Sequence, residues 1–189
     1  MLPIFLLLFL GGCSVGDLIL GPKADVRYSR TPYSVKNSFG RHRYMPESRY
    51  RLKHRHSRGI ASHYGGKFNG RPTASLVIFD EKQLTAAHPT AVLPSIAIVK
   101  SVENGKSIHV ILTDRGPYAY NRICDLSVGS AQKLGVKMRP QQVEITILPE
   151  HSRILARHWK KFTNKRLPDA LFKHIHDKKL LQRYLQARL

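Results

Sequence analysis

The segment IAIVKSVENGKSIHVILT, residues 96–113, decides the fold class of this chain. Its two halves, residues 96–102 and 107–113, are rich in β-branched side chains, which favour strands. Asn104-Gly105 lies between the halves and is the strongest short signal for a β-hairpin, because tight hairpin turns need positive φ angles that these residues accept. We therefore predict an antiparallel pair of strands at this point.

On either side of the hairpin the chain continues in short elements. Residues 143–148 (VEITIL) alternate apolar and polar side chains and predict a further strand. Residues 127–134 predict one short helix, with Ser127 as its N-cap and Gly135 as its stop. Short strands, tight turns and one small helix are typical of a small β-barrel, so we predict a mainly β domain over residues 59–149.

The positive charge of the chain lies mostly outside this domain. The 189 residues carry a formal net charge of +20, a length that fits one domain with extensions. Residues 23–58 have 11 basic and 2 acidic side chains, residues 150–189 have 11 and 3, and residues 59–149 have 10 and 6. Basic arms usually bind anionic partners such as nucleic acid, anionic lipid, lipopolysaccharide or acidic wall polymers. Solvated arms with no single partner are the alternative.

The N-terminus resembles that of an exported lipoprotein. Residues 2–10 (LPIFLLLFL) form an apolar run of signal-peptide length, and Leu-Gly-Gly-Cys at residues 10–13 resembles a bacterial lipobox. We predict a signal peptide over residues 1–12, a lipidated Cys13 and a basic, mostly disordered tether over residues 13–58. A buried apolar segment with a chance cysteine is the alternative, since no Lys or Arg precedes the apolar run.

Export and lipidation set further expectations. Ser14 after the cysteine points to the periplasmic face of the outer membrane, and an exported chain argues against a nucleic-acid partner. We expect the basic arms to contact anionic lipid or lipopolysaccharide. Cys124 would be the only remaining thiol and is predicted to be buried and inert.

Residues 150–189 predict a basic helical tail. Pro168 suits a helix start. The apolar side chains beyond it make a rough stripe among basic ones: Leu171, Phe172, Ile175, Leu181, Tyr184 and Leu185. Either a basic amphipathic helix on a membrane surface or a helix docked on the barrel explains the stripe.

Some polar residues stand where catalytic groups are often found. Asp114 directly follows a predicted strand and precedes a Gly-Pro turn, so its carboxylate can face the mouth of a cleft. A structural ion pair with Arg115 or a turn cap is the alternative. His88, taken alone, is more often structural than catalytic. Asp80 can cap residues 81–84, and Asp125 can satisfy backbone donors near the helix start.

Histidine pairs in the arms do not complete a metal site. His54-x-His56 and His174-x-His176 have no further ligands at the spacing of a zinc site. The chain also has no Gly-rich phosphate loop and no GxSxG motif. We therefore expect neither a metal nor a cofactor.

Three groups of motifs together point to one family. They are ASHYG and FNGRPTA at residues 61–65 and 68–74, Asp80 with LTAAH at 84–88, and TDRGPY at 113–118 leading into RICDLS at 122–127. From Gly59 to about Leu148 the chain resembles the rare lipoprotein A (RlpA) family of septal-ring lytic transglycosylases. The resemblance implies a double-psi β-barrel, the fold of barwin and expansin domains.

The resemblance also implies a reaction. Such enzymes cleave the β-1,4 bond between N-acetylmuramic acid and N-acetylglucosamine in peptidoglycan strands that lack stem peptides. The muramoyl 6-hydroxyl attacks its own anomeric carbon, so no water enters and a 1,6-anhydro ring remains. One carboxyl group can act first as acid and then as base, unlike the paired carboxylates of glycoside hydrolases. The implied setting is a monomer in the cell envelope, at the division septum.

By this resemblance, individual residues acquire roles. Asp114 would be the acid and base, His88 would orient it or contact the sugar, and Asp80 would be a supporting carboxylate. Arg115 would hold the lactyl carboxylate of muramic acid or organise the turn. Further substrate contacts are implied for three aromatic or imidazole side chains: His63, Tyr64 and Tyr118.

The chain departs from the family pattern at several positions. Leu76-Val77 replaces a Gly-Glu pair, so the acidic residue that works with the main aspartate is missing, although Glu81 is nearby. His63 replaces a tryptophan, the loop after His88 is longer, and no SPOR-type glycan-binding domain is expected. Two hypotheses follow: a lytic transglycosylase of reduced or retuned activity, and a non-catalytic barrel that binds glycan strands and tethers the outer membrane to the wall.

Overall fold

The computed structural model describes residues 33–37, 40–44, 56–118, 121–136 and 139–187. Cys13 and the signal-peptide segment lie outside these residues. Within the expected disordered tether, β1 (Tyr33–Asn37) and β2 (Gly40–Tyr44) form an antiparallel hairpin. The sequence had not indicated this hairpin, because a hairpin needs only local pairing and not the sustained apolar period that the segment lacks.

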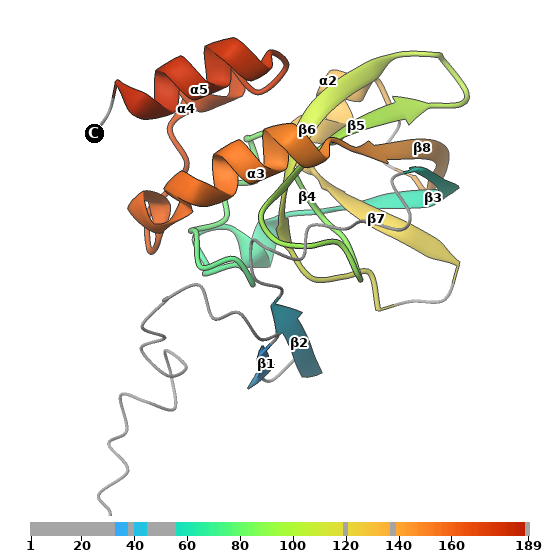
Figure 1. Cartoon of the computed structure of the whole chain (residues 1–189). Coiled ribbons are helices and arrows are strands. Elements are labelled where there is room, and N and C mark those ends of the chain that lie inside the picture. The colour runs from blue at the N-terminus through green and yellow to red at the C-terminus, as the bar shows by residue number, and fades with distance from the viewer. Residues whose placement is uncertain (1–32, 38–39, 45–55, 119–120, 137–138, 188–189) are drawn as a thin grey trace, which may run out of the picture.

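Six strands close into a barrel in the order β3-β7-β4-β6-β5-β8 (Figure 1). Their bounds are β3 His56–Tyr64, β4 Thr85–Ala87, β5 Ser95–Ser101, β6 Ser107–Asp114, β7 Arg122–Ser127 and β8 Gln141–Ile147. The pairs β3–β7 and β4–β6 are parallel, and the other neighbours are antiparallel. The mainly β barrel is thus confirmed, with its first strand starting at His56 and not at Gly59.

The local sequence signals for a hairpin and a helix are confirmed. β5 and β6 pair with Lys100 opposite Ser107, and Gly105 in their connection has a φ of 71°. A short 3-10 turn, η2 (Gly66–Phe68), precedes the loop to β4. The helix α2 (Val128–Leu134) begins after Ser127, whose hydroxyl accepts a hydrogen bond from the Ser130 amide, and ends at Gly135 with a φ of 71°.

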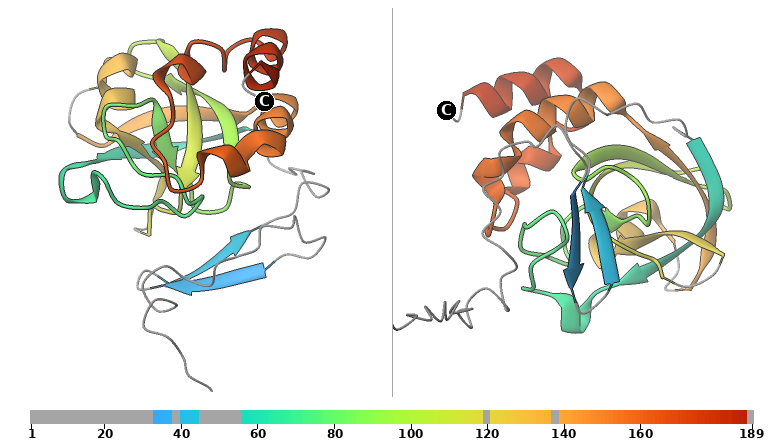
Figure 2. Two further views of the ribbon diagram at one scale, coloured as in Figure 1. Left: turned by 90° about the vertical axis from the view of Figure 1, so that its left-hand side faces the viewer. Right: turned by 60° about the horizontal axis from the view of Figure 1, so that its bottom comes forward.

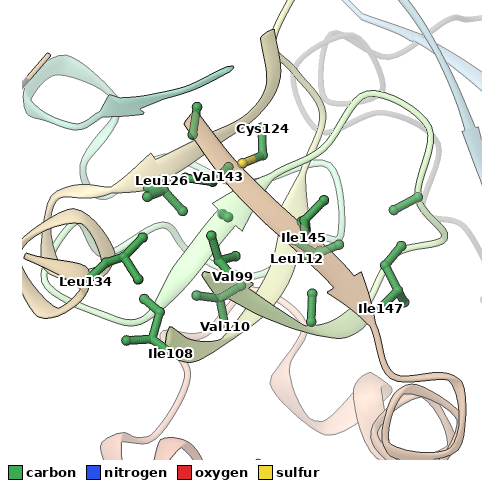
Figure 3. Close-up of a cluster of buried hydrophobic side chains, with 14 of the residues drawn as sticks. Val99, Ile108, Val110, Leu112, Cys124, Leu126, Leu134, Val143, Ile145 and Ile147 are labelled. Atoms are coloured by element: carbon green, nitrogen blue, oxygen red, sulfur yellow. The ribbon is translucent and has the colours of Figure 1, made fainter. Parts of the chain in front are cut away.

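The barrel interior is filled by side chains from alternating strand positions (Figure 3). Val99, Val110 and Leu112 from β5 and β6 are fully buried and meet Val143 and Ile145 from β8. Cys124 is also fully buried, and burial, with a smaller effect from Asp125, raises the pKa of its thiol to about 12. The prediction of a buried thiol is therefore confirmed, and its inertness, which burial and a raised pKa favour, stays a prediction.

The C-terminal tail packs against the outside of the barrel (Figures 1 and 2). It consists of α3 (Pro149–His158), η3 (Trp159–Phe162), α4 (Asp169–Phe172) and α5 (Lys178–Gln186). The second apolar cluster, here called the outer cluster, joins it to the barrel wall. Its buried members are Val77, Ile96, Ile111, Leu155, Trp159, Phe162, Leu167, Leu171, Ile175, Leu181 and Leu185.

The outer cluster decides between the two interpretations of the apolar stripe. Leu171, Ile175 and Leu181 are at most 1% exposed, so the stripe has no apolar face left for a membrane surface. The membrane-surface helix was a wrong alternative and the docked helix is the right one. Ile96 and Ile111 pair across β5 and β6 and face the tail, which explains why these strands are apolar on both sides. No helix in the described ranges is long and apolar enough to cross a membrane.

Candidate active site

The ends of two parallel strands bring Asp114 and His88 together. β4 and β6 run in the same direction, with Ala87 opposite Asp114, so both strands end at the same edge of the barrel. The His88 amide donates a hydrogen bond to the Asp114 carbonyl at 3.0 Å. The register of the β4–β6 pair therefore holds as neighbours two residues that are 26 positions apart in the sequence.

The Asp114 carboxylate is partly buried and held by amides. Its Oδ1 accepts hydrogen bonds from the Ala74 amide at 2.9 Å and the Arg115 amide at 2.8 Å. Burial raises the pKa of Asp114, and the two amides and the Arg115 charge lower it by less, so the pKa lies above its ordinary value. A raised pKa suits a carboxyl group that must donate a proton and later take one up.

His88 is a neutral imidazole in this setting. Burial, together with the nearby Arg115 charge, lowers its pKa to about 4. Its Nδ1 accepts hydrogen bonds from the Thr90 amide at 3.2 Å and the Ala91 amide at 2.9 Å. Because Nδ1 accepts, the single ring proton of the neutral form is on Nε2, which makes His88 a hydrogen-bond donor with a fixed ring orientation.

Arg115 organises the turn that follows β4. Its Nη1 donates to the carbonyls of His88 at 3.2 Å and Ala91 at 2.6 Å. These bonds hold in place the loop after His88, which is longer than the corresponding loop in the family pattern. The turn-organising alternative therefore has geometric support, while a contact with a lactyl carboxylate stays a prediction.

Two tyrosines near the carboxylate differ in their exposure. Tyr118 is 64% exposed, and its ring comes close to Gly116 in the turn after Asp114, so it can offer a surface to a sugar ring. The ring of Tyr64 stacks on Phe79 with 4.5 Å between centroids, and its hydroxyl is buried. Burial and the charges of Asp114 and Asp125 raise the pKa of Tyr64, which favours its neutral form. Its expected contact with a bound glycan stays a prediction.

His63 and Asp80 are not joined to Asp114 by the hydrogen bonds and ion pairs that the structure gives them. His63 is on β3, separated from β6 by two strands, and lines a shallow depression with Arg139 and Gln141. Asp80 accepts a hydrogen bond from the Lys82 amide at 3.0 Å through Oδ1 and pairs with Arg166 at 3.2 Å through Oδ2. The turn-cap alternative for Asp80 thus has direct support, and its catalytic role stays a prediction.

Two other acidic residues near the site have structural partners. Glu81 accepts a hydrogen bond from the Gly66 amide at 2.6 Å, which directs its carboxylate toward the turn at η2. Asp125 accepts one from the Ser62 hydroxyl at 2.6 Å and pairs with Arg122 at 3.5 Å. These partners of Asp125 are side chains, and the cap of α2 is Ser127, as predicted.

Val77, which by the family resemblance replaces a glutamate, lies in the outer cluster. Its side chain is 2% exposed. The preceding residue, Leu76, has a φ of 68°, the left-handed backbone that the glycine of the family motif accepts more easily. The described residues contain no group of three or more His, Cys, Asp or Glu side chains placed to hold a metal ion. Asp114 is the carboxyl group of the candidate site, and its catalytic role stays a prediction.

Comparison with known proteins identifies the domain. Residues 56–147 match the family model described as lytic transglycolase. Together with the closed six-stranded topology, this match defines the barrel as a double-psi β-barrel of the lytic transglycolase class. Through this domain the chain is similar to the rare lipoprotein A family, as its identity with individual members shows.

Two relatives illustrate the similarity. An endolytic peptidoglycan transglycosylase RlpA of Neisseria meningitidis serogroup A is 49% identical over 77 residues, covering 41% of this chain and 32% of that protein. The protein of the same name from Haemophilus influenzae is 38% identical over 107 residues, covering 57% of this chain and 36% of its own. The matched region thus spans about a third of these relatives.

Among solved structures, a Streptomyces papain inhibitor aligns with a TM-score of 0.40 and 18% identity, covering 49% of this chain and 94% of the inhibitor. That likeness is too weak to bear on function.

Proposed function

We propose that this barrel is a lytic transglycosylase domain acting on peptidoglycan glycan strands. The proposed reaction cleaves the β-1,4 bond between N-acetylmuramic acid and N-acetylglucosamine and leaves 1,6-anhydro ends. The observation that carries the proposal is the half-buried Asp114 with a raised pKa beside the neutral donor His88. The names of the relatives support the substrate class.

The residues suggest which group would carry out each step of the reaction. Protonated Asp114 donates its proton to the glycosidic oxygen as the bond to the leaving sugar breaks. The resulting carboxylate then takes the proton from the muramoyl 6-hydroxyl as that oxygen bonds to the anomeric carbon, so Asp114 ends protonated again. His88 would donate a hydrogen bond from Nε2 to the sugar, and the exposed ring of Tyr118 would stack on it.

A second candidate function is glycan binding without cleavage. It is favoured by the buried Val77 and by the engagement of Glu81 with the Gly66 amide, which leave Asp114 without the second acid of the family motif. In this case the barrel would hold glycan strands and connect the outer membrane to the wall.

The cellular setting is proposed from the sequence. A lipidated Cys13 would anchor the chain to the periplasmic face of the outer membrane, with action at the division septum. The exposed Lys and Arg side chains of the tail suit contact with anionic lipid or lipopolysaccharide, because the apolar side of the tail is occupied by the barrel.

Digestion of purified glycan strands tests both candidates. The full-length chain would be incubated with strands that carry or lack stem peptides, and products read by mass spectrometry for 1,6-anhydromuramic ends. We expect Asp114→Asn to lower the rate by about 10²–10⁴-fold, because it removes the proton donor. Glu103→Gln is the matched control, since it makes the same chemical change at an exposed ion pair with Arg139. Intact strands that still co-sediment with the wild-type chain would support the binding candidate instead.

A further inference from the structure

One loop lies between the Asp114 carboxylate and the C-terminal tail. On the barrel side, the Ala74 amide donates to Asp114 Oδ1 at 2.9 Å and the Ser75 amide donates to the Thr113 carbonyl at 2.9 Å. Two successive amides of the loop are therefore bonded to the last two residues of β6. Any movement of this loop changes the hydrogen bonding of the carboxylate.

On its other side the same loop is bonded to the tail. The indole Nε1 of Trp159 donates to the Ser75 carbonyl at 2.8 Å. The Asn164 amide donates to the Leu76 carbonyl at 2.7 Å, and the Ile78 amide donates to the Lys165 carbonyl at 2.9 Å. Of these three bonds the indole bond is the one made by a side chain. It acts on the Ser75–Leu76 peptide group, which directly follows the peptide group bonded to Thr113 and lies two units along from the one whose amide binds Asp114.

The loop needs such support because its backbone is strained. Leu76 adopts a φ of 68°, which costs a non-glycine residue about 1–2 kcal/mol relative to ordinary backbone. A strained conformation persists only where surrounding contacts determine it. Here Val77 inserts into the outer cluster, and Trp159, only 7% exposed, packs in the same cluster while bonding the loop.

We propose that Trp159 is a positioning residue for Asp114: its indole N–H holds the Ser75 carbonyl and thereby keeps the Ala74 amide on the carboxylate. The tail then takes part in positioning the carboxylate. It holds the loop rigid at Leu76 and Val77, which replace the Gly-Glu pair of the family motif. Its importance for catalysis rests on the proposed function, whereas the positioning of the carboxylate does not.

The composition of the chain allows a clean test. Trp159 is the only tryptophan, so global replacement of tryptophan by β-(benzothiophen-3-yl)alanine in the full-length chain changes one side chain. This analogue keeps the shape of the ring and puts sulfur in place of the N–H. The Asp114 carboxyl group would be titrated by ¹³C NMR, and hydrogen exchange of the Ala74 amide measured in parallel.

The expected result follows from the role of the Ala74 bond. That bond stabilises the charged carboxylate and lowers the Asp114 pKa, so its loosening should raise the pKa further, by about half a unit, and speed exchange of the amide. Trp159→Phe, a second variant without the donor, should shift the pKa in the same direction. Leu185→Val is the matched control, because it loosens the outer cluster without touching the indole bond and should leave the titration unchanged.

Other outcomes would overturn the proposal. An unchanged Asp114 titration in the folded analogue protein would show that the indole bond does not position the carboxylate. Failure of both Trp159 variants to fold would show that the indole is needed only for stability. A shift of equal size in Leu185→Val would assign the effect to general loosening. Because the titration needs no substrate, these results are independent of whether the chain cleaves glycan.

Discussion

The two apolar clusters of this protein have different origins and different consequences. The inner cluster fills the barrel and comes wholly from residues 56–147, the part that matches the family model. The outer cluster joins the barrel wall to a tail that lies beyond that match. The inner cluster holds the strand register that sets Asp114 beside His88, and the outer cluster holds the loop that binds the Asp114 carboxylate. A family barrel and a tail outside the family match therefore share the positioning of one carboxyl group.

The largest effect should come from a cavity in the inner cluster. Leu112 is fully buried in the barrel, and Leu171 is equally buried in the outer cluster. We expect Leu112→Ala to lower the free energy of unfolding by about 3–5 kcal/mol and to shift the backbone circular dichroism and Trp159 fluorescence transitions together. The matched variant Leu171→Ala should shift the Trp159 transition to lower urea than the circular dichroism transition, because the tail can open locally. Coincident transitions in Leu171→Ala would mean that the two clusters form one cooperative unit.

A carboxylate at position 77 should break the outer cluster and not restore a catalytic pair. Val77→Glu puts an ionisable group among apolar side chains of the tail, so it must either be buried with its charge or take up a proton. We expect a loss of about 2–4 kcal/mol in urea unfolding and a red shift of Trp159 emission as the tail loosens.

Val77→Thr, which keeps the shape without the charge, is the control for that substitution. Its loss of stability should be clearly smaller, because a buried hydroxyl costs less than a carboxyl group. A Val77→Glu chain that is as stable as wild type and forms more 1,6-anhydro product would contradict this expectation and show that position 77 can face the substrate.

Low pH should weaken the packing of the tail on the barrel and lower the stability of the protein. Burial, with the charges of His176 and His151, lowers the pKa of His109 on β6, and burial followed by the charge of Lys178 lowers that of His151 on α3. Burial also lowers the pKa of His88 to about 4. A histidine whose pKa is lowered by folding binds its proton more weakly in the folded state. Stability is therefore full above about pH 6.5 and is lost as the pH falls toward 4, by about 3 kcal/mol from His88 alone.

Thermal unfolding between pH 7 and 4 measures this effect. Asp114, with its raised pKa, works in the opposite direction over part of the range and reduces the slope. Asp177 and Glu150 also face His151 and moderate its shift. His109→Gln removes one titrating group of the cluster and should make stability less dependent on pH. An equally steep profile in that variant would place the acid sensitivity elsewhere.

The smallest effect is expected at Asp80, which links the barrel loop to the tail. Asp80→Asn removes the charge that pairs with Arg166, a side chain that is 58% exposed, so the change in stability should be below about 1 kcal/mol. Activity on glycan should fall by less than about tenfold, far below the loss expected at Asp114. A loss of activity as large as that of Asp114→Asn would instead establish Asp80 as the supporting carboxylate that the family resemblance implies.

Most of the fold prediction rested on residues that lie close together in the sequence. Asn104-Gly105 marked the hairpin, and Ser127 and Gly135 marked both ends of α2, because a turn and a helix end depend on a few neighbouring residues. The strand that ends at Asp114 was found from the same segment. The tail was harder to place, since its apolar stripe suits either a membrane or a barrel wall, and nothing in the stripe itself identifies the surface that covers it.

The sequence by itself determined a small β-barrel with Asp114 at a strand end, since alternating apolar side chains and turn residues are local features, and the family resemblance added the double-psi topology. Only the tertiary structure decided that His88 is neutral, because its pKa depends on burial and on Arg115, which lies distant in sequence. It alone placed Val77 under the tail and bonded Trp159 to Ser75 across 84 positions. The physical reason is that burial and long-range hydrogen bonds arise from how separate segments pack, which no single segment encodes.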